Sequence, residues 1–279
     1  MSNSYNIIKA FNNNILLVNS DGVEKIIIGK GIGFNKKVGD ILKAPSNIEK
    51  MFTIQDPVNQ NKFNELVSSV PEDIMSYCEE IISMLEKELN ESLDESIHIA
   101  LTDHISFSLK RLKENNEIVN PFLVETEVLF KKEFLLAKKA VKLLEERTGI
   151  FIPEGEAGFI ALHIHSARNK GNLSNTVKYA YISNSISELI EQELNIKLDK
   201  ESLYYARFII HLRFTIERLI NNIHLKNELL STIKRKYKAS YMLSSQIGKI
   251  LEANLNIEVH PDEIGYIAIH LETLKNVTK

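Results

Sequence analysis

The sequence has little cysteine and no long apolar stretch. Its 279 residues include one cysteine, Cys78, which excludes an internal disulfide and, within the helical pattern IMSYCEEII, is expected to be a buried thiol. The longest apolar runs are about five residues, far too short to span a bilayer. The N-terminus lacks the basic start and apolar core of a signal peptide. We therefore expect a cytoplasmic protein without membrane insertion.

Net charge is also small, but it is unevenly distributed. The formal net charge of the chain is −3 at pH 7. Residues 1–54 contain seven lysines and four acidic residues, which gives +3 there and −6 over the remainder. A basic head on an acidic body favours an anionic partner for the head alone.

Residues 1–54 have the pattern of a small antiparallel sheet. Four segments rich in β-branched and aromatic residues are predicted as strands, at residues 5–11, 15–18, 23–28 and 51–54. Turn formers such as Asn12 to Asn14 and Asp21-Gly22 separate them. We predict a four-stranded all-β domain over residues 1–56, which dimerises because its core is small, and a polar linker over residues 57–64.

Beyond the linker the sequence has helical periodicity and contains a duplication. IALTDHISFSLKRL around His104 resembles ARFIIHLRFTIERL around His211, and GFIALHI around His163 resembles GYIAIHL around His270. The two matches share one offset, because 211 − 104 and 270 − 163 both equal 107. Several matches at one offset indicate an internal repeat. We predict two homologous all-α helical-bundle domains, at residues 65–171 and 172–279.

The four repeated histidines are the candidate functional residues of the helical part. A single histidine among apolar neighbours is usually a core residue, but packing alone does not require imidazole at four repeated positions. Imidazole supplies a neutral nitrogen near pH 7, which can bind a metal, transfer a proton or accept a phosphoryl group.

Phosphoryl acceptance fits the surrounding sequence best. We predict no metal site, since His163 and His165 point to different helix faces and no Cys or carboxylate cluster completes the ligands. Hydrolysis would need a nucleophile or paired acids, and only Asp103 and Glu156 are close in sequence. A phosphoryl group would place about −1.5 to −2 charges on a face suited to burial. Such a charge would force an interface to repack.

A glycine-rich basic loop, residues 29–37 (GKGIGFNKK), is the candidate binding element of the head. Its spacing fits neither a P-loop nor a dinucleotide fingerprint. Glycines beside lysines suit close approach to a phosphate backbone, and Phe34 could stack on an unpaired base. The amides of residues 12–14 could read base edges. Composition alone supports this interpretation and an ordinary hairpin with a solvated basic turn equally.

At this point the motifs resemble a known family, the BglG/SacY-type transcriptional antiterminators. The resemblance covers essentially the whole chain and rests on KAFNNNILLV, IGKGIGFNKKVGD, ALTDHI, GFIALHI, FIIHLRF and DEIGYIAIHLE. It implies a co-antiterminator RNA-binding domain followed by two phosphotransferase regulation domains. Implied RNA-contacting residues are Asn14, Gly29, Lys30 and Phe34, with Asn12 and Lys9, and the implied phosphorylation sites are His104, His163, His211 and His270.

The same resemblance implies partners and a mode of control, and we expect no cofactor. The protein would be a homodimer that binds a hairpin in nascent mRNA and prevents a terminator from forming. A sugar-specific phosphotransferase transporter would inactivate it through His104 and His163, and the HPr phosphocarrier would activate it through His211 and His270. Arg207 or Arg213 could pair with a phosphate at His211.

Two other classes of function stay open at this stage. One is a DNA-binding activator with the same regulation domains, which residues 1–54 disfavour because they show strands and no helix-turn-helix pattern. The other is a histidine-dependent phosphohydrolase, which would require turnover beyond stoichiometric phosphorylation.

Overall fold

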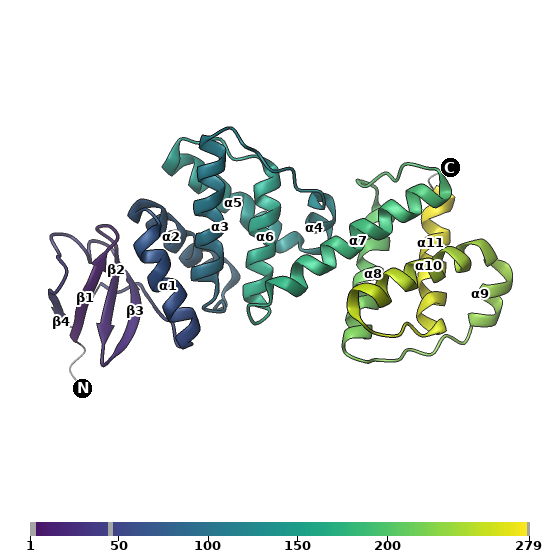
Figure 1. Cartoon of the computed structure of the whole chain (residues 1–279), viewed down its shortest axis with the longest axis horizontal. Helices are drawn as coiled ribbons and strands as arrows, with labels where there is room; N and C mark the ends of the chain where they lie inside the picture. Colours follow the sequence, from purple (N-terminus) through teal and green to yellow (C-terminus); the bar gives the residue numbers. More distant parts are fainter. Residues whose placement is uncertain (1–3, 44–46, 278–279) are drawn as a thin grey trace. The chain divides into compact units, whose positions relative to one another are not determined.

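The computed structural model describes residues 4–43 and 47–277, which form two compact units (Figure 1). Within this range the first unit extends to Val119 and resumes over Leu135–Leu173. The second unit comprises Asn120–Phe134 and the residues from Ser174 onward. No helix of the described residues is long and apolar enough to cross a membrane.

The N-terminal part is an antiparallel sheet of five strands, one more than the sequence predicts. The strands are β1 (Ser4–Ala10), β2 (Ile15–Ser20), β3 (Val23–Ile28), β4 (Ile41–Lys43) and β5 (Lys50–Thr53), in the order β4-β1-β2-β3-β5. The additional strand, β4, has three residues and pairs with the start of β1. Its shortness and its single buried residue, Leu42, leave too little alternation for sequence reasoning to detect.

The β2–β3 hairpin explains why this sequence folds as a sheet. Its turn residues Asp21 and Gly22 both have positive φ angles, 55° and 82°, as the two-residue turn favoured by right-handed strand twist requires. The register that follows pairs Leu16 with Ile27 and Val18 with Lys25. One face of the sheet therefore carries a core of Tyr5, Ile7, Leu16, Val18, Ile27, Ile32 and Leu42.

Residues 57–64, expected to form a linker, are instead helical. They form the first turns of α1 (Pro57–Ser69). Asp56 caps this helix, because its side chain accepts from the backbone N–H groups of Val58 and Asn59 at 2.7 and 3.1 Å. Pro57 occupies the first helical position, where a missing N–H costs nothing. The polar composition of this segment thus reflects a capped, exposed helix start.

The remaining helices repeat with the predicted offset. In chain order they are α2 (Glu72–Leu89), α3 (Ile97–Lys113), α4 (Leu123–Leu129), α5 (Lys131–Thr148), α6 (Glu154–Arg168), α7 (Leu173–Leu194), α8 (Leu203–Ile220), α9 (Leu230–Lys236), α10 (Lys238–Leu255) and α11 (Pro261–Val277). Helices α4 and α5 correspond to α9 and α10 with an offset of 107 at both ends, and α3 and α6 correspond to α8 and α11.

Packing differs between the copies at one helix. In the first unit α3 packs against α1, α2 and α6. In the second unit α11 packs against α8, α9 and α10. Helix α4 belongs by sequence to the first copy, yet it lies in the second unit and packs on α8.

Candidate functional site

The first pair of repeated histidines comes together between two helices. His104 on α3 and His163 on α6 have ring centroids 5.0 Å apart, and Phe159 lies 5.8 Å from His104. Both imidazoles are partly buried. Burial, with the nearby charge of His104, lowers the pKa of His163 from 6.5 to about 3. The His163 ring is therefore neutral at pH 7.

A buried carboxylate contacts this pair. The Oε2 of Glu156 lies 3.2 Å from the Nε2 of His104, and its Oε1 lies 2.8 Å from the Nη2 of Arg111. The hydroxyl of Ser108 also donates to Glu156. Burial alone would raise the pKa of Glu156, but the contacts with His104, Ser108 and Arg111 outweigh it and lower the pKa to about 2. The first pair thus lies beside a fixed negative charge that Arg111 compensates.

The second pair is closer and stacked. His211 on α8 and His270 on α11 have centroids 3.7 Å apart, with ring planes 12° from parallel. Next to them, Arg218 binds Glu263 through two contacts of 2.8 and 2.6 Å and donates to Thr215 at 3.0 Å. The carboxylate–arginine–hydroxyl arrangement of the first copy therefore recurs in the second at the offset of the histidines.

Both rings of the second pair are neutral at pH 7. Burial lowers the pKa of His270 to about 4, assisted by the charges of His211, Arg207 and Arg218. Burial also lowers the pKa of His211, and Arg207 and Arg218 again contribute. Two stacked imidazoles could not both carry a positive charge without strong repulsion.

The glycine-rich loop of the head is built against the asparagine turn. The N–H of Gly29 donates to the Asn14 carbonyl at 2.9 Å, and that of Gly31 donates to the Asn14 side chain at 2.8 Å. A Cβ on Gly33 would lie 2.3 Å from the carbonyl oxygen of Asn12, so only glycine fits there. Asn14 therefore holds the loop in shape in addition to any contact with RNA.

The loop presents two side chains to solvent. Phe34 is 62% exposed. Lys30 is also exposed, while its carbonyl accepts from Asn47 at 2.7 Å. An exposed ring beside a cation on a rigid loop can stack on a base and contact the adjoining phosphate.

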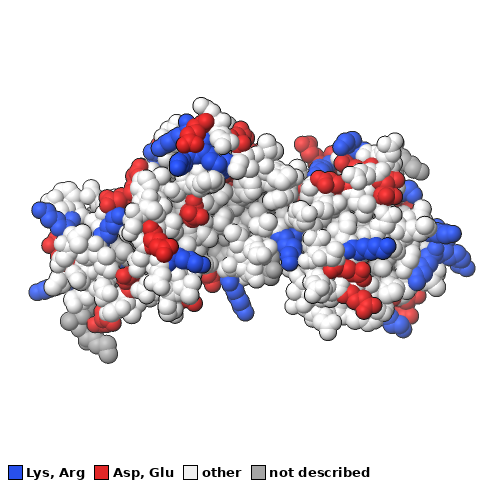
Figure 2. All heavy atoms as spheres, in the orientation of Figure 1, with Lys and Arg blue, Asp and Glu red and all other residues white. Residues whose placement is uncertain are grey.

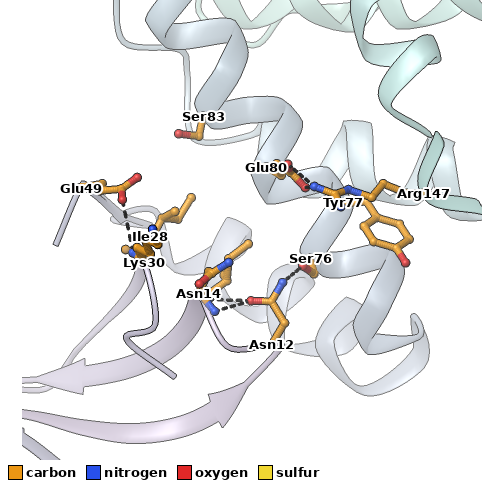
Figure 3. Close-up of a pocket in the computed structure, with 12 residues that line it drawn as sticks. Asn12, Asn14, Ile28, Lys30, Glu49, Ser76, Tyr77, Glu80, Ser83 and Arg147 are labelled. Atoms are coloured by element: carbon orange, nitrogen blue, oxygen red, sulfur yellow. Dashed lines mark hydrogen bonds and ion pairs between the residues drawn. The ribbon is translucent and has the colours of Figure 1, made fainter. Parts of the chain in front are cut away.

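Four of the six residues assigned to RNA line one hollow of about 520 Å³ (Figure 3). These four are Asn12, Asn14, Gly29 and Lys30. Asn12, Asn14 and Lys30 lie on the sheet side of the hollow, opposite Ser76 and Glu80 of α2. Lys9 and Phe34 are not among its lining residues.

Two of the six also contact the helical region. The side-chain amide of Asn12 donates to Ser76 on α2. The ammonium of Lys9 donates to the Val67 carbonyl at 2.8 Å and lies 3.4 Å from Glu72. An RNA that used Asn12 and Lys9 would have to displace these contacts.

Comparison with known proteins agrees with this organisation. The sequence profile of the CAT RNA binding domain matches residues 5–61, and that of the PRD domain matches residues 79–167 and 184–274. The chain belongs to the CAT–PRD transcription antiterminators. It is 36% identical to transcription antiterminator LicT of Bacillus subtilis (strain 168) over 270 residues, covering 95% of this chain and 97% of the relative.

Other relatives and one solved structure extend this comparison. The PtsGHI operon antiterminator of Bacillus subtilis (strain 168) is 38% identical, with 99% of each chain covered. The GlcT CAT-PRDI crystal structure is 42% identical, covers 59% of this chain and 98% of that chain, and has a TM-score of 0.51. The CAT domain is accordingly the five-stranded sheet with the start of α1, and the two PRDs carry the two histidine pairs.

Sequence reasoning missed the charged partners of the histidines in both PRDs. Glu156 was considered only as a possible acid for hydrolysis, whereas Arg111, Arg218 and Glu263 were not singled out. The signal was present, because the glutamates and the arginines recur at the same offset as the histidines. Of the two arginines assigned to phosphate pairing, Arg207 is close enough for its positive charge to help lower the pKa of both rings of the second pair.

Arg213, the second arginine assigned to phosphate pairing, is engaged on another face. It binds Glu217 at 2.8 Å and donates to the Leu129 carbonyl at 3.0 Å. Arg218 is the additional cation beside the second pair.

Charged side chains are mixed over both units on the face shown in Figure 2. Basic side chains gather at α9, where Lys234, Arg235 and Lys236 are exposed. The net charge of +3 on residues 1–54 therefore does not form a continuous basic surface on this face.

Proposed function

We propose that this antiterminator acts as a homodimer which binds a hairpin in nascent mRNA and prevents the overlapping terminator from forming. Its CAT domain binds the RNA, and phosphorylation of PRD histidines by the phosphotransferase system regulates antitermination. The observation that carries the proposal is the proximity of the two repeated histidines in each PRD, with a buried neutral imidazole in each pair, since a neutral nitrogen is what a phosphoryl donor requires.

Exposed aromatic residues next to the histidines support a role for an interface. Phe107 and Phe214 lie three residues after His104 and His211, on the same helix face, and are 59% and 49% exposed. The two phenylalanines are equivalent positions of the repeat. Large exposed apolar side chains at equivalent positions favour a protein–protein contact around each histidine pair. A second copy of the chain fits this contact, because each phosphate would then appear twice near the symmetry axis.

The two PRDs differ in the charged residues that a phosphorylated histidine would contact. This difference supports opposite effects of phosphorylation in the two PRDs. Arg207 is exposed and acts on the second pair, while the equivalent residue of the first PRD is Ala100. A phosphate at His211 or His270 would gain the exposed cation of Arg207, which the first PRD lacks, whereas a glutamate paired with an arginine lies beside the histidines in both PRDs. We therefore assign inactivation by a sugar-specific transporter to the first PRD and activation by HPr to the second.

The protein would act in the cytoplasm, where nascent mRNA is made, and would not turn over a substrate. Each histidine would accept one phosphoryl group, which distinguishes this function from that of a phosphohydrolase.

RNA binding is tested first, with the full chain and a terminator-overlapping hairpin that carries unpaired bases. Phe34→Ala should weaken binding by about 1–3 kcal/mol through loss of a stacked base. Val38→Ala is the matched control, because Val38 is 73% exposed in the same segment. Equal affinity of the wild type and a folded Phe34→Ala variant would remove Phe34 from the RNA interface.

Regulation is tested with single Asp substitutions at His104, His163, His211 and His270, measuring dimerisation and RNA affinity. The first two should weaken both properties and the last two should preserve or strengthen them. His165→Asp is the control, since this residue neighbours the first pair but the equivalent residue of the second PRD is Glu272. Equal weakening by all four substitutions would refute the opposed action of the two PRDs.

A further inference from the structure

A second cluster of histidines lies in the second PRD, away from the stacked pair. His224 is in the loop after α8, His260 directly precedes α11, and Asp262 is in the first turn of α11. Their ligand atoms are mutually close: His224 Nε2 lies 3.2 Å from His260 Nδ1 and 2.9 Å from Asp262 Oδ2, and the last two lie 3.1 Å apart. Among the described residues, this is the group of three that could hold a metal ion.

These distances match the edges of a tetrahedral metal site. With ligand bonds of about 2.0–2.1 Å around Zn²⁺, tetrahedral geometry separates neighbouring ligand atoms by about 3.3 Å. The three measured edges, 3.2, 2.9 and 3.1 Å, are slightly shorter, and the entry of an ion would widen them by a few tenths of an ångström. Two imidazole nitrogens and one carboxylate oxygen are also a ligand set that Zn²⁺ prefers.

We propose that His224, His260 and Asp262 form a Zn²⁺ site, with water as the fourth ligand. Both imidazoles are more than half exposed, at 55% and 57%, so the ion has access, while the Asp262 side chain is 9% exposed. Without the ion, the Nε2 proton of His224 is donated to Asp262. On binding, His224 ligates as the neutral tautomer with its proton on Nδ1, and His260 Nδ1 gives up its weak 3.3 Å contact with the Asp262 amide.

The scaffold of the site is fixed by contacts that do not involve the ligand atoms. Asn227 donates from its side chain to the Asp262 carbonyl at 3.4 Å, and the hydroxyl of Tyr266 donates to the Lys226 carbonyl at 2.9 Å. Gly265 allows this approach, because a Cβ there would lie 2.8 Å from the Asn227 side chain. The loop and α11 are therefore held together before any ion binds, which lowers the cost of ordering the ligands.

The ligand set is specific to the second PRD. At the equivalent positions of the repeat, the first PRD has Glu117, Pro153 and Gly155 in place of the three ligands. The site is also separate from the stacked pair, since Asp262 and His270 are eight residues, or about 12 Å of helix, apart. Zn²⁺ would join the loop to the helix that carries His270 and would stabilise one PRD and not the other.

The experiment is calorimetric titration of the full chain, without a histidine tag and stripped with a chelator, with Zn²⁺. We expect one ion per chain and a rise in melting temperature with zinc concentration. His224→Gln and His260→Gln should each weaken binding at least about tenfold. His224→Gln keeps a donor for Asp262, so its melting temperature without zinc reports whether the variant is folded. His165→Gln is the matched control and should bind as the wild type does.

Cobalt provides a spectroscopic readout of geometry. Co²⁺ bound to the wild-type chain should give the intense visible absorption of a tetrahedral site, and this band should disappear in His260→Gln. Absence of zinc binding, or binding that both Gln variants retain, would overturn the proposal. Loss of binding in His270→Gln with retention in His224→Gln would place the ion at the stacked pair and would equally refute it.

Discussion

Replacing His163 tests the claim that the first PRD holds a neutral imidazole. Burial lowers the pKa of this residue to about 3, whereas an exposed histidine has a pKa near 6.5. Between these two pKa values, His163 is therefore protonated in the unfolded chain and neutral in the folded chain. The contribution of His163 to the free energy of unfolding is fully present above pH 6.5 and is lost as the pH is lowered toward 3.

The magnitude at pH 5 follows from the unfolded state. At about 1.36 kcal/mol per pH unit below 6.5, lowering the pH from 7.5 to 5 costs the folded state about 2 kcal/mol through His163. This value hardly changes while the folded-state pKa stays below about 4.5, so it depends on burial of the ring more than on the depth of the shift.

Calorimetric melting of the full chain at pH 7.5 and pH 5 is the assay, with ¹⁵N resonances of the imidazole rings as a direct report of protonation. His163→Gln should lose less stability on acidification than the wild type, by about 2 kcal/mol. His165→Gln, on the same helix, shows the effect of losing an imidazole outside the pair. The reasoning is wrong if wild type and His163→Gln lose equal stability, or if the His163 ring is protonated at pH 5.

Three further predictions concern the PRDs. Glu156→Gln should destabilise the first PRD by about 3–5 kcal/mol, because it leaves the guanidinium of Arg111 buried without its counter-charge; calorimetry would show this, and a double variant with both residues apolar should recover much of the loss. Phe214→Ser should weaken dimerisation in analytical ultracentrifugation without lowering the melting temperature of the monomer, since the ring is exposed. Mass spectrometry at alkaline pH, after incubation with HPr, its kinase and phosphoenolpyruvate, should find phosphate at His270 and none at His165; the reverse result would contradict assignment by the repeat.

Much of the architecture could be predicted because it is encoded locally or by repetition. The Asp21-Gly22 turn specifies its hairpin through backbone conformation alone, and the shared offset identified both histidine pairs before their proximity was known. Neither β4 nor the start of α1 was predicted. One is too short to show alternation, and the other has a polar composition that suits an exposed helix start as well as a linker.

Contacts between distant residues were beyond reach of the sequence. The cluster of His224 and Asp262 joins residues 38 positions apart, and the hydrogen bond between Asn12 and Ser76 joins residues 64 apart. Such contacts depend on how whole helices and strands pack against each other. The local pattern of a single sequence does not specify this packing.

Helix α4 has a practical consequence for anyone who divides this protein into pieces. A cleavage between residues 171 and 172, where the repeat suggests a boundary, would remove α4 from the unit in which it folds. The C-terminal piece would retain Tyr205 and Lys200 but lose Glu125, which accepts a hydrogen bond from the tyrosine and lies 2.7 Å from the ammonium. It would also expose the apolar surface of α8 that α4 covers. Poor solubility of such a piece would then reflect a missing helix of seven residues, and restoring residues 120–134 as an added peptide should correct it.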